Sequence, residues 1–171
     1  ISEQLIDTFL EAGKIARDIS NKGVKITIKE DKSPVTDGDL AVDFILRNKI
    51  KKLTPDVSII SEETVNLKEK ITDKTFWLID PIDGTKDYIK KKDEYTLNAA
   101  LIINLNPALG VVYAPAKDRL FYSYGKDKAF EISNGKKSIL NGRKIKTNEI
   151  IALINSDKTP DEVLEIYKKN K

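Results

Sequence analysis

The sequence contains no cysteine, no histidine and no methionine among its 171 residues. The lack of cysteine excludes disulfides and thiolate chemistry. The lack of histidine excludes Ser-His-Asp catalysis, imidazole metal ligands and a histidine general base. Any metal must therefore be held by oxygen atoms, which favours a hard cation such as Mg²⁺. Because the chain starts at Ile1 and has no methionine, we expect the true start of the protein to be missing.

Long apolar runs and concentrated charge are also absent. No run approaches the roughly 20 apolar residues of a membrane span, and no signal peptide is visible, so the default expectation is a cytoplasmic protein. The net charge is only +3 and is spread along the chain, which argues against nucleic acid as a partner. The length and the 40% hydrophobic content fit one domain with a core of its own.

The pattern of apolar residues predicts an α+β layered fold. Apolar residues at three- and four-residue spacing predict helices over 3–19 and 37–53. A further helix is expected after Thr159-Pro160. Alternating or continuous apolar runs predict a mostly antiparallel sheet, with strands at 24–28, 57–60, 76–79, 95–103, 108–114, 119–124, 128–132 and 151–154.

The strongest candidate site is the run Asp80-Pro81-Ile82-Asp83-Gly84-Thr85, which follows the apolar strand Phe76–Ile79. Two aspartates three residues apart in a tight turn can point into one space, where they repel each other unless a cation neutralises them. Gly84 allows a ligand to approach the backbone closely. If a helix begins here, its free N–H groups can hold a phosphate. Carboxylates beside an anion cradle are the parts needed for phosphoryl transfer to water.

The other polar candidates also have structural interpretations. Thr36-x-x-Asp39 resembles a capping box, and by itself Asp39 is better explained as a helix cap. Glu62 and Glu63, which follow a strand, are by themselves best interpreted as a solvated pair. The run Lys90-Lys91-Lys92 is expected to be a solvated loop.

Taken together, these segments resemble the inositol monophosphatase superfamily, whose fold is a layered α/β sandwich of the fructose-1,6-bisphosphatase type. Within it the chain looks most like the 3'(2'),5'-bisphosphate nucleotidases of the bacterial CysQ type, because Lys86-Asp87-Tyr88 and Glu94–Asn98 are similar to that branch. The motifs that carry the resemblance run in the right order along the chain: Ser33–Asp39, Ser61-Glu62-Glu63, Trp77–Thr85 and Gly110–Pro115.

The resemblance implies a role for each candidate residue. Glu62, Asp80 and the Ile82 carbonyl would hold a first Mg²⁺, and Asp80 would bridge to a second Mg²⁺ bound by Asp83. Gly84, Thr85, Lys86 and Asp83 would bind substrate, the first two through backbone N–H groups on phosphate. Thr85 with Glu62 would help deprotonate the attacking water, and Asp39 and Thr36 would support that water or a third, weaker metal ion. Li⁺ is the expected inhibitor. A metal lowers the pKa of coordinated water, so no histidine base is needed.

One departure from the family pattern is large. A C-terminal Trp-Asp-x-Ala motif, which supplies a further metal ligand, is missing, since Trp77 is the only tryptophan. We therefore expect residues 1–150 to form the metal-binding N-terminal subdomain and residues 151–171 to begin an incomplete C-terminal one. The chain would be a truncated product, a fragment or an incomplete record of a longer protein. If nothing is missing, very weak or no activity is expected.

Three functions stay open at this point. The first is a Mg²⁺-dependent bisphosphate nucleotidase that converts 3'-phosphoadenosine 5'-phosphate to AMP. The second is an inositol or other sugar monophosphatase that uses the same metal site. The third is an inactive remnant or binding module, because an uncovered apolar sheet face would favour self-association. The expected partner is a small phosphorylated substrate, and a homodimer stays open.

Overall fold

The computed structural model describes residues 1–64, 72–142 and 160–169. The chain divides into two compact units, Ile1–Asn141 and Gly142–Lys171. In the second unit the described element is helix α4 (Asp161–Lys169), at the place where the sequence predicts a helix. The predicted subdomain boundary at 150/151, the strand over 151–154 and the capping Thr159 lie outside the described residues.

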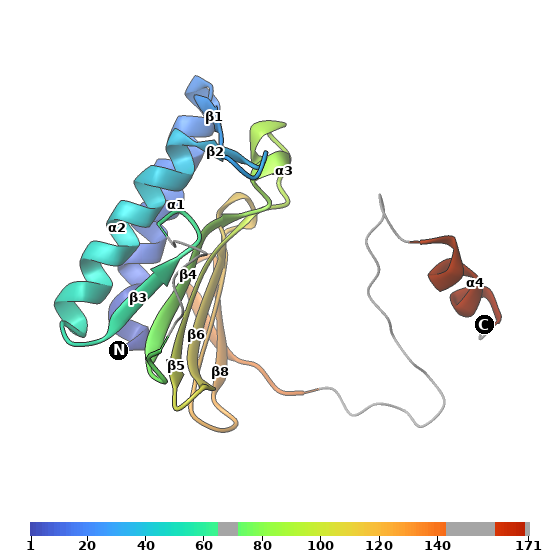
Figure 1. Cartoon of the computed structure of the whole chain (residues 1–171). Helices are drawn as coiled ribbons and strands as arrows, with labels where there is room; N and C mark the ends of the chain where they lie inside the picture. Colours follow the sequence, from blue (N-terminus) through green and yellow to red (C-terminus); the bar gives the residue numbers. More distant parts are fainter. Residues whose placement is uncertain (65–71, 143–159, 170–171) are drawn as a thin grey trace. The chain divides into compact units, whose positions relative to one another are not determined.

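The first unit begins with two helices joined by a β-hairpin. Helix α1 covers Ser2–Lys22 and helix α2 covers Asp37–Leu53, so both predicted helices are confirmed. Between them, β1 (Ile26–Ile28) pairs antiparallel with β2 (Pro34–Thr36). Figure 1 shows the hairpin at one end of the two helices, next to the short helix α3 (Thr85–Ile89).

A seven-stranded sheet forms the other layer of the first unit. Its order follows the chain from β3 to β9. β3 and β4 are parallel, and every later neighbouring pair is antiparallel, which confirms the predicted mostly antiparallel α+β fold. The 3₁₀ helix η1 (Pro115–Lys117) joins β6 to β7. The strands are β3 (Ser58–Ser61), β4 (Phe76–Asp83), β5 (Thr96–Ile103), β6 (Asn106–Ala114), β7 (Arg119–Tyr124), β8 (Ala129–Ser133) and β9 (Lys136–Ile139).

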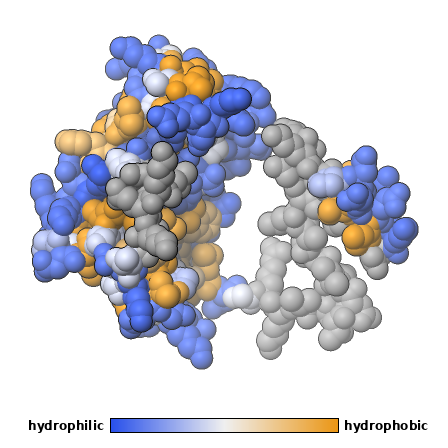
Figure 2. Space-filling model, viewed as in Figure 1, coloured by the Kyte–Doolittle hydropathy of each residue, from blue (hydrophilic) through white to orange (hydrophobic). Residues whose placement is uncertain are grey.

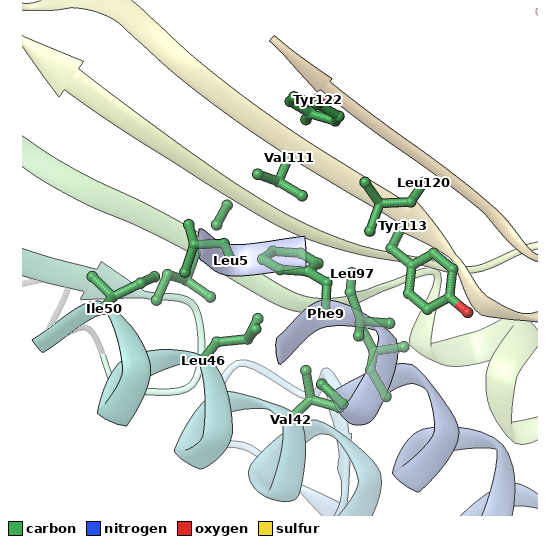
Figure 3. Close-up of a cluster of buried hydrophobic side chains, with 14 of the residues drawn as sticks. Leu5, Phe9, Val42, Leu46, Ile50, Leu97, Val111, Tyr113, Leu120 and Tyr122 are labelled. Atoms are coloured by element: carbon green, nitrogen blue, oxygen red, sulfur yellow. The ribbon is translucent and has the colours of Figure 1, made fainter. Parts of the chain in front are cut away.

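The core lies between the helices and one face of this sheet. Figure 3 shows Leu5 and Phe9 of α1 and Val42 of α2 facing the strands. Alternation along the strands turns every second side chain toward the helices. Burial of this apolar surface stabilises the layers, at roughly 25 cal/mol per Å² removed from water. The strand residues that close the core include Trp77, Ile79, Leu97, Ala99, Leu101, Val111, Tyr113, Leu120 and Tyr122.

Not every apolar side chain of α2 belongs to the core. The buried apolar stripe of the helix is Val42, Leu46 and Ile50, whereas Leu40 is 54% exposed and Phe44 is 65% exposed. Hydrophobic patches interrupt the hydrophilic surface of the face drawn in Figure 2. The stripe follows the four-residue spacing of a helix that presents one side to a sheet.

Candidate metal and phosphate site

The candidate site begins where β4 ends. The sequence predicts a tight turn from Asp80, but the structure continues the strand to Asp83 with a register shift between the two aspartates. Ile82 is buried and anchors this irregular stretch. Gly84 then adopts a left-handed φ of 93°, and helix α3 starts at Thr85. A side chain at Gly84 would meet the Glu94 carbonyl oxygen at 2.7 Å, so both conformation and space require glycine there.

Glu62 reaches the same place from the neighbouring strand. β3 and β4 are parallel, and their pairing ends with Ser61 opposite Ile79. The Glu62 N–H donates to the Ile79 carbonyl at 3.1 Å. Because the pairing continues by one step, Glu62, the residue after β3, lies beside Asp80 of β4. Two acidic residues that are far apart in the sequence therefore become neighbours.

Asp80 is the carboxylate on which the charges of the neighbouring acidic residues act. Burial, followed by the negative charges of Glu62 and Asp83, raises the pKa of the Asp80 carboxyl to about 7. A hydrogen bond with Glu62 and the charge of Asp39 act in the same direction. Asp80 Oδ1 is buried and accepts no hydrogen bond in the described part of the chain. A buried anionic oxygen without a partner among like charges is a position where a cation is favoured.

Asp39 joins this group from the N-terminus of α2. The predicted capping box is confirmed, since the Thr36 side chain accepts from the Asp39 N–H while Asp39 Oδ2 accepts from the Thr36 N–H at 2.8 Å. The second carboxylate oxygen, Oδ1, accepts from the Thr85 hydroxyl at 3.2 Å. Burial raises the pKa of Asp39, although these hydrogen bonds act against the shift. Asp39 is therefore both a helix cap and a direct link to α3.

The interpretation of Glu62 and Glu63 as a solvated pair is wrong for Glu63. Its side chain is only 3% exposed and pairs with the Lys29 ammonium group at 2.9 Å. Lys29 also lies 3.7 Å from Glu62, whose side chain is 51% exposed. Lys29 was not predictable from the sequence, because it lies in the loop of the β1–β2 hairpin, where nothing in the local pattern distinguishes it from other solvated lysines.

Of the remaining predicted site residues, Thr85, Ile82 and Thr36 contact one another or Asp39, and Lys86 does not. Thr85 donates toward the Ile82 carbonyl at 3.0 Å, so Thr85, Ile82 and Asp39 form one contact group. Thr36 belongs to it through Asp39. Lys86 is exposed, and in the described part of the chain its side chain makes no hydrogen bond or ion pair with this group.

The donor set suits a hard divalent cation. Among the described residues, no three acidic side chains are grouped closely enough to hold a metal ion. A bound cation would nevertheless give the buried Asp80 Oδ1 a partner and offset the negative charges around it. Carboxylate and carbonyl oxygens, the donors available here, are the ligands of Mg²⁺. Fold and site together define a layered α+β protein that gathers carboxylates beside a glycine turn.

The chain belongs to the inositol monophosphatase family, whose model matches residues 1–169. The 3'(2'),5'-bisphosphate nucleotidase CysQ of Aggregatibacter actinomycetemcomitans is 30% identical over 171 residues, which are 98% of this chain and 64% of that protein. The IMPase of Thermotoga maritima has a TM-score of 0.65 at 29% identity, over 77% of this chain and 50% of that one.

A third comparison concerns lithium. Staphylococcal inositol monophosphatase-1, solved as a LiCl-soaked inhibitory complex, shares the fold with a TM-score of 0.65 at 21% identity, over 75% of this chain and 49% of that one. The family is magnesium-dependent. The chain spans less than two thirds of the length of the nucleotidase that it matches. No helix among the described residues is long and apolar enough to cross a membrane.

Proposed function

We propose that the natural protein containing this chain is a Mg²⁺-dependent phosphomonoester hydrolase, most specifically a 3'(2'),5'-bisphosphate nucleotidase. The reaction would convert 3'-phosphoadenosine 5'-phosphate and water to AMP and phosphate. The observation that supports this most directly is the raised pKa of Asp80, which burial and then the negative charges of Glu62 and Asp83 shift to about 7. The similarity to the CysQ nucleotidase supports the choice of substrate.

The metal ligands would come from β3 and β4. Glu62, Asp80 and the Ile82 carbonyl would hold one Mg²⁺, and Asp80 and Asp83 a second. When bound, Mg²⁺ lowers the pKa of coordinated water and neutralises charge on the phosphoryl group. Asp80 would contribute to both sites, and it is the carboxylate on which the charges of both Glu62 and Asp83 act.

The protein groups around the attacking water would move its proton. The Thr85 hydroxyl donates to Asp39 Oδ1 at 3.2 Å, so its oxygen keeps lone pairs for a proton from water. Thr85, with Glu62, would orient the water and take its proton, and Asp39 would receive the Thr85 proton. Thr36 keeps Asp39 in place through the capping box. A P–O bond to the water oxygen forms as the P–O bond to the 3'-oxygen breaks, with no phosphoenzyme, and the departing 3'-oxygen takes a proton from solvent water.

Substrate phosphate would lie against the start of α3. The Gly84 and Thr85 N–H groups, at the first positions of the helix, have no partner within it. Glycine permits the left-handed turn that starts α3 here, since a side chain would meet the Glu94 carbonyl oxygen. Asp83 and the exposed Lys86 would complete the contacts with the substrate, Lys86 by its charge.

Several finer features are part of the same proposal. We propose two or three Mg²⁺ ions, inhibition by Li⁺ and a cytoplasmic location, with residues 1–150 as the metal-binding subdomain. The lithium complex of the staphylococcal relative supports the choice of inhibitor. A homodimer stays open, and sedimentation of the purified protein would decide it.

The first prediction tests this function with purified natural protein. Phosphate release from 3'-phosphoadenosine 5'-phosphate should require Mg²⁺ and should exceed release from inositol 1-phosphate. The change Asp83→Asn should leave the fold intact, because Asp83 is exposed, while turnover falls by about a thousandfold, in the range of a lost electrostatic catalytic group. The measurement is phosphate release together with circular dichroism.

A matched control is Asp127→Asn, which removes a carboxylate from an exposed turn and should leave turnover unchanged. Faster turnover of inositol 1-phosphate would change the assignment to an inositol monophosphatase. The similarity to the Thermotoga maritima protein supports this second candidate. Full activity of Asp83→Asn would place the metal site elsewhere and contradict the proposal.

A further inference from the structure

A separate pocket lies at the C-terminal end of α1. It has a volume of about 210 Å³. Arg17 and Asn21 of α1 form one side, Lys91 and Lys92 after α3 form another, and Tyr95 contributes an aromatic wall. None of the proposed metal ligands lines it. A water molecule occupies roughly 30 Å³ of liquid, so the pocket has room for a phosphate group with a small substituent.

The lining contains more basic than acidic side chains. Arg17, Lys91 and Lys92 face one acidic lining residue, Asp93. Lys92 already pairs with Asp87 at 3.1 Å, so the charge available for a ligand comes chiefly from Arg17 and Lys91. The chain as a whole has nearly equal numbers of basic and acidic residues, 30 and 27, so this excess is local.

Arg17 is held in place before any ligand arrives. Its Nη1 donates to the Pro115 carbonyl and to the Tyr113 hydroxyl, the latter at 3.3 Å. These contacts use one nitrogen of the guanidinium group and leave the Nε and Nη2 donors outside the described hydrogen bonds. A fixed guanidinium fork matches the oxygens of phosphate and loses little side-chain entropy on binding.

The backbone of the lysine turn is fixed as well. Lys91 has a left-handed φ of 57°. Its N–H donates to the Tyr88 carbonyl at 3.0 Å, and the Lys92 N–H donates to the Asp87 carbonyl at 2.9 Å. Cations at the ends of α1 and α3 also offset the helix dipoles, but that role requires no cavity between the two helix ends.

We propose that this pocket is a second anion site, which binds a phosphate dianion independently of the metal centre. The phosphate can be inorganic or the phosphoryl group of a small phosphomonoester, since both present the same oxygens to Arg17 and Lys91. This inference goes beyond the hydrolase function and does not depend on it, because none of the proposed metal ligands contributes to the pocket.

The second prediction is tested by titrating the whole chain in EDTA, where the carboxylates of the proposed metal site repel phosphate. Amide chemical shifts and calorimetry follow two probes, inorganic phosphate and glycerol 3-phosphate. Shifts should centre on Ser20, Asn21 and Lys91–Asp93. Arg17→Gln should weaken binding about tenfold, as expected for a lost charge-assisted contact. A lower affinity for glycerol 3-phosphate would identify inorganic phosphate as the favoured source.

Two further variants keep the test decisive. Lys91→Asn should also weaken binding about tenfold and should fold, because asparagine tolerates a left-handed φ, whereas Arg17→Gln loses the contact with Pro115. The charge-matched control, Lys126→Gln at an exposed turn, should bind like the wild type. The proposal is overturned by unchanged affinity in folded Lys91→Asn, by equal loss in Lys126→Gln, or by shifts confined to Gly84–Lys86.

Discussion

At the scale of single residues, the carboxylates of β4, of α2 and of the segment after β3 show how the same side-chain type is held in different ways. Asp39 is satisfied by Thr36 and Thr85, and Glu63 by Lys29. Asp80 is different because one of its buried oxygens has no hydrogen-bond partner among the described residues and its neighbours carry the same charge. Hydrogen bonds and ion pairs therefore hold Asp39 and Glu63 in place, whereas Asp80 is the carboxylate that we propose as a metal ligand.

The third prediction concerns the pH dependence of the metal-free protein. The folded-state pKa of Asp80 is about 7, against an ordinary value of 3.8. Between these values the folded state holds a proton that the unfolded state has lost, so stability falls as pH rises through this window. In EDTA the melting temperature should therefore fall between roughly pH 4 and pH 8, and Mg²⁺ should reverse the fall at the upper end.

Asp80→Asn removes the titrating group from this comparison. The variant should lose most of the decrease with pH and should gain little stability from Mg²⁺, both measured by thermal denaturation. The control Asp127→Asn should behave like the wild type, because that carboxylate is exposed in a turn. A wild-type melting temperature that rises from acid to neutral pH would contradict the assigned pKa shift.

At the scale of elements, helix α3 depends on close packing for its position. Tyr88 is buried, its hydroxyl donates to the Ala16 carbonyl of α1 at 2.6 Å, and its ring contacts Tyr95 edge-to-face at 4.9 Å. Gly38 of α2 makes room for it, since an added Cβ would lie 2.4 Å from the Tyr88 hydroxyl. The residue that clears this space therefore lies directly beside Asp39.

The fourth prediction tests this packing. Gly38→Ala should lower the free energy of unfolding by about 1–3 kcal/mol, the usual cost of overpacking, and should weaken Mg²⁺ binding because Tyr88 and α3 must shift. Denaturant unfolding and calorimetry measure the two effects. Gly110→Ala is the control, because the nearest atom to its added Cβ is the Ser123 hydroxyl at 3.6 Å. Equal effects of the two changes would refute the packing argument.

At the scale of the molecule, the described hydrophobic core is confined to the first unit. Its buried members run from Leu5 to Tyr122, and the partly buried side chains packed on them reach Ile132. β8 contributes Phe130, whose ring stacks on Tyr122 at 5.0 Å. The unit Ile1–Asn141 therefore has the apolar interior that an independently folding domain requires.

The fifth prediction follows from this confinement. A chain that ends after Asn141 should unfold cooperatively with a melting temperature close to that of the whole chain, as measured by calorimetry. A chain that ends after Tyr124 should be much less stable, because it loses Phe130 and Ile132 together with two strands. A large loss of stability in the longer of the two shortened chains would show that the core is not self-sufficient.

Much of this architecture was predictable because it depends on local patterns. Helices α1 and α2 and strands β1 and β3–β8 were predicted because apolar spacing sets the buried face of each element, and α4 was predicted from the helix start at Thr159-Pro160. The capping box at Thr36 and Asp39 was also a local signal. The motifs quoted for the resemblance identified the family, and the family model confirmed it.

Other features were decided only by the tertiary structure. The sequence could not show that Lys29 would form an ion pair with a buried Glu63 side chain, or that β4 would continue to Asp83. Both features depend on neighbours that are distant in the chain. The pocket between Arg17 and Lys91 likewise joins a helix end to a loop more than seventy residues away in the sequence. Local propensity determines which elements form, whereas the convergence of charges depends on how those elements pack.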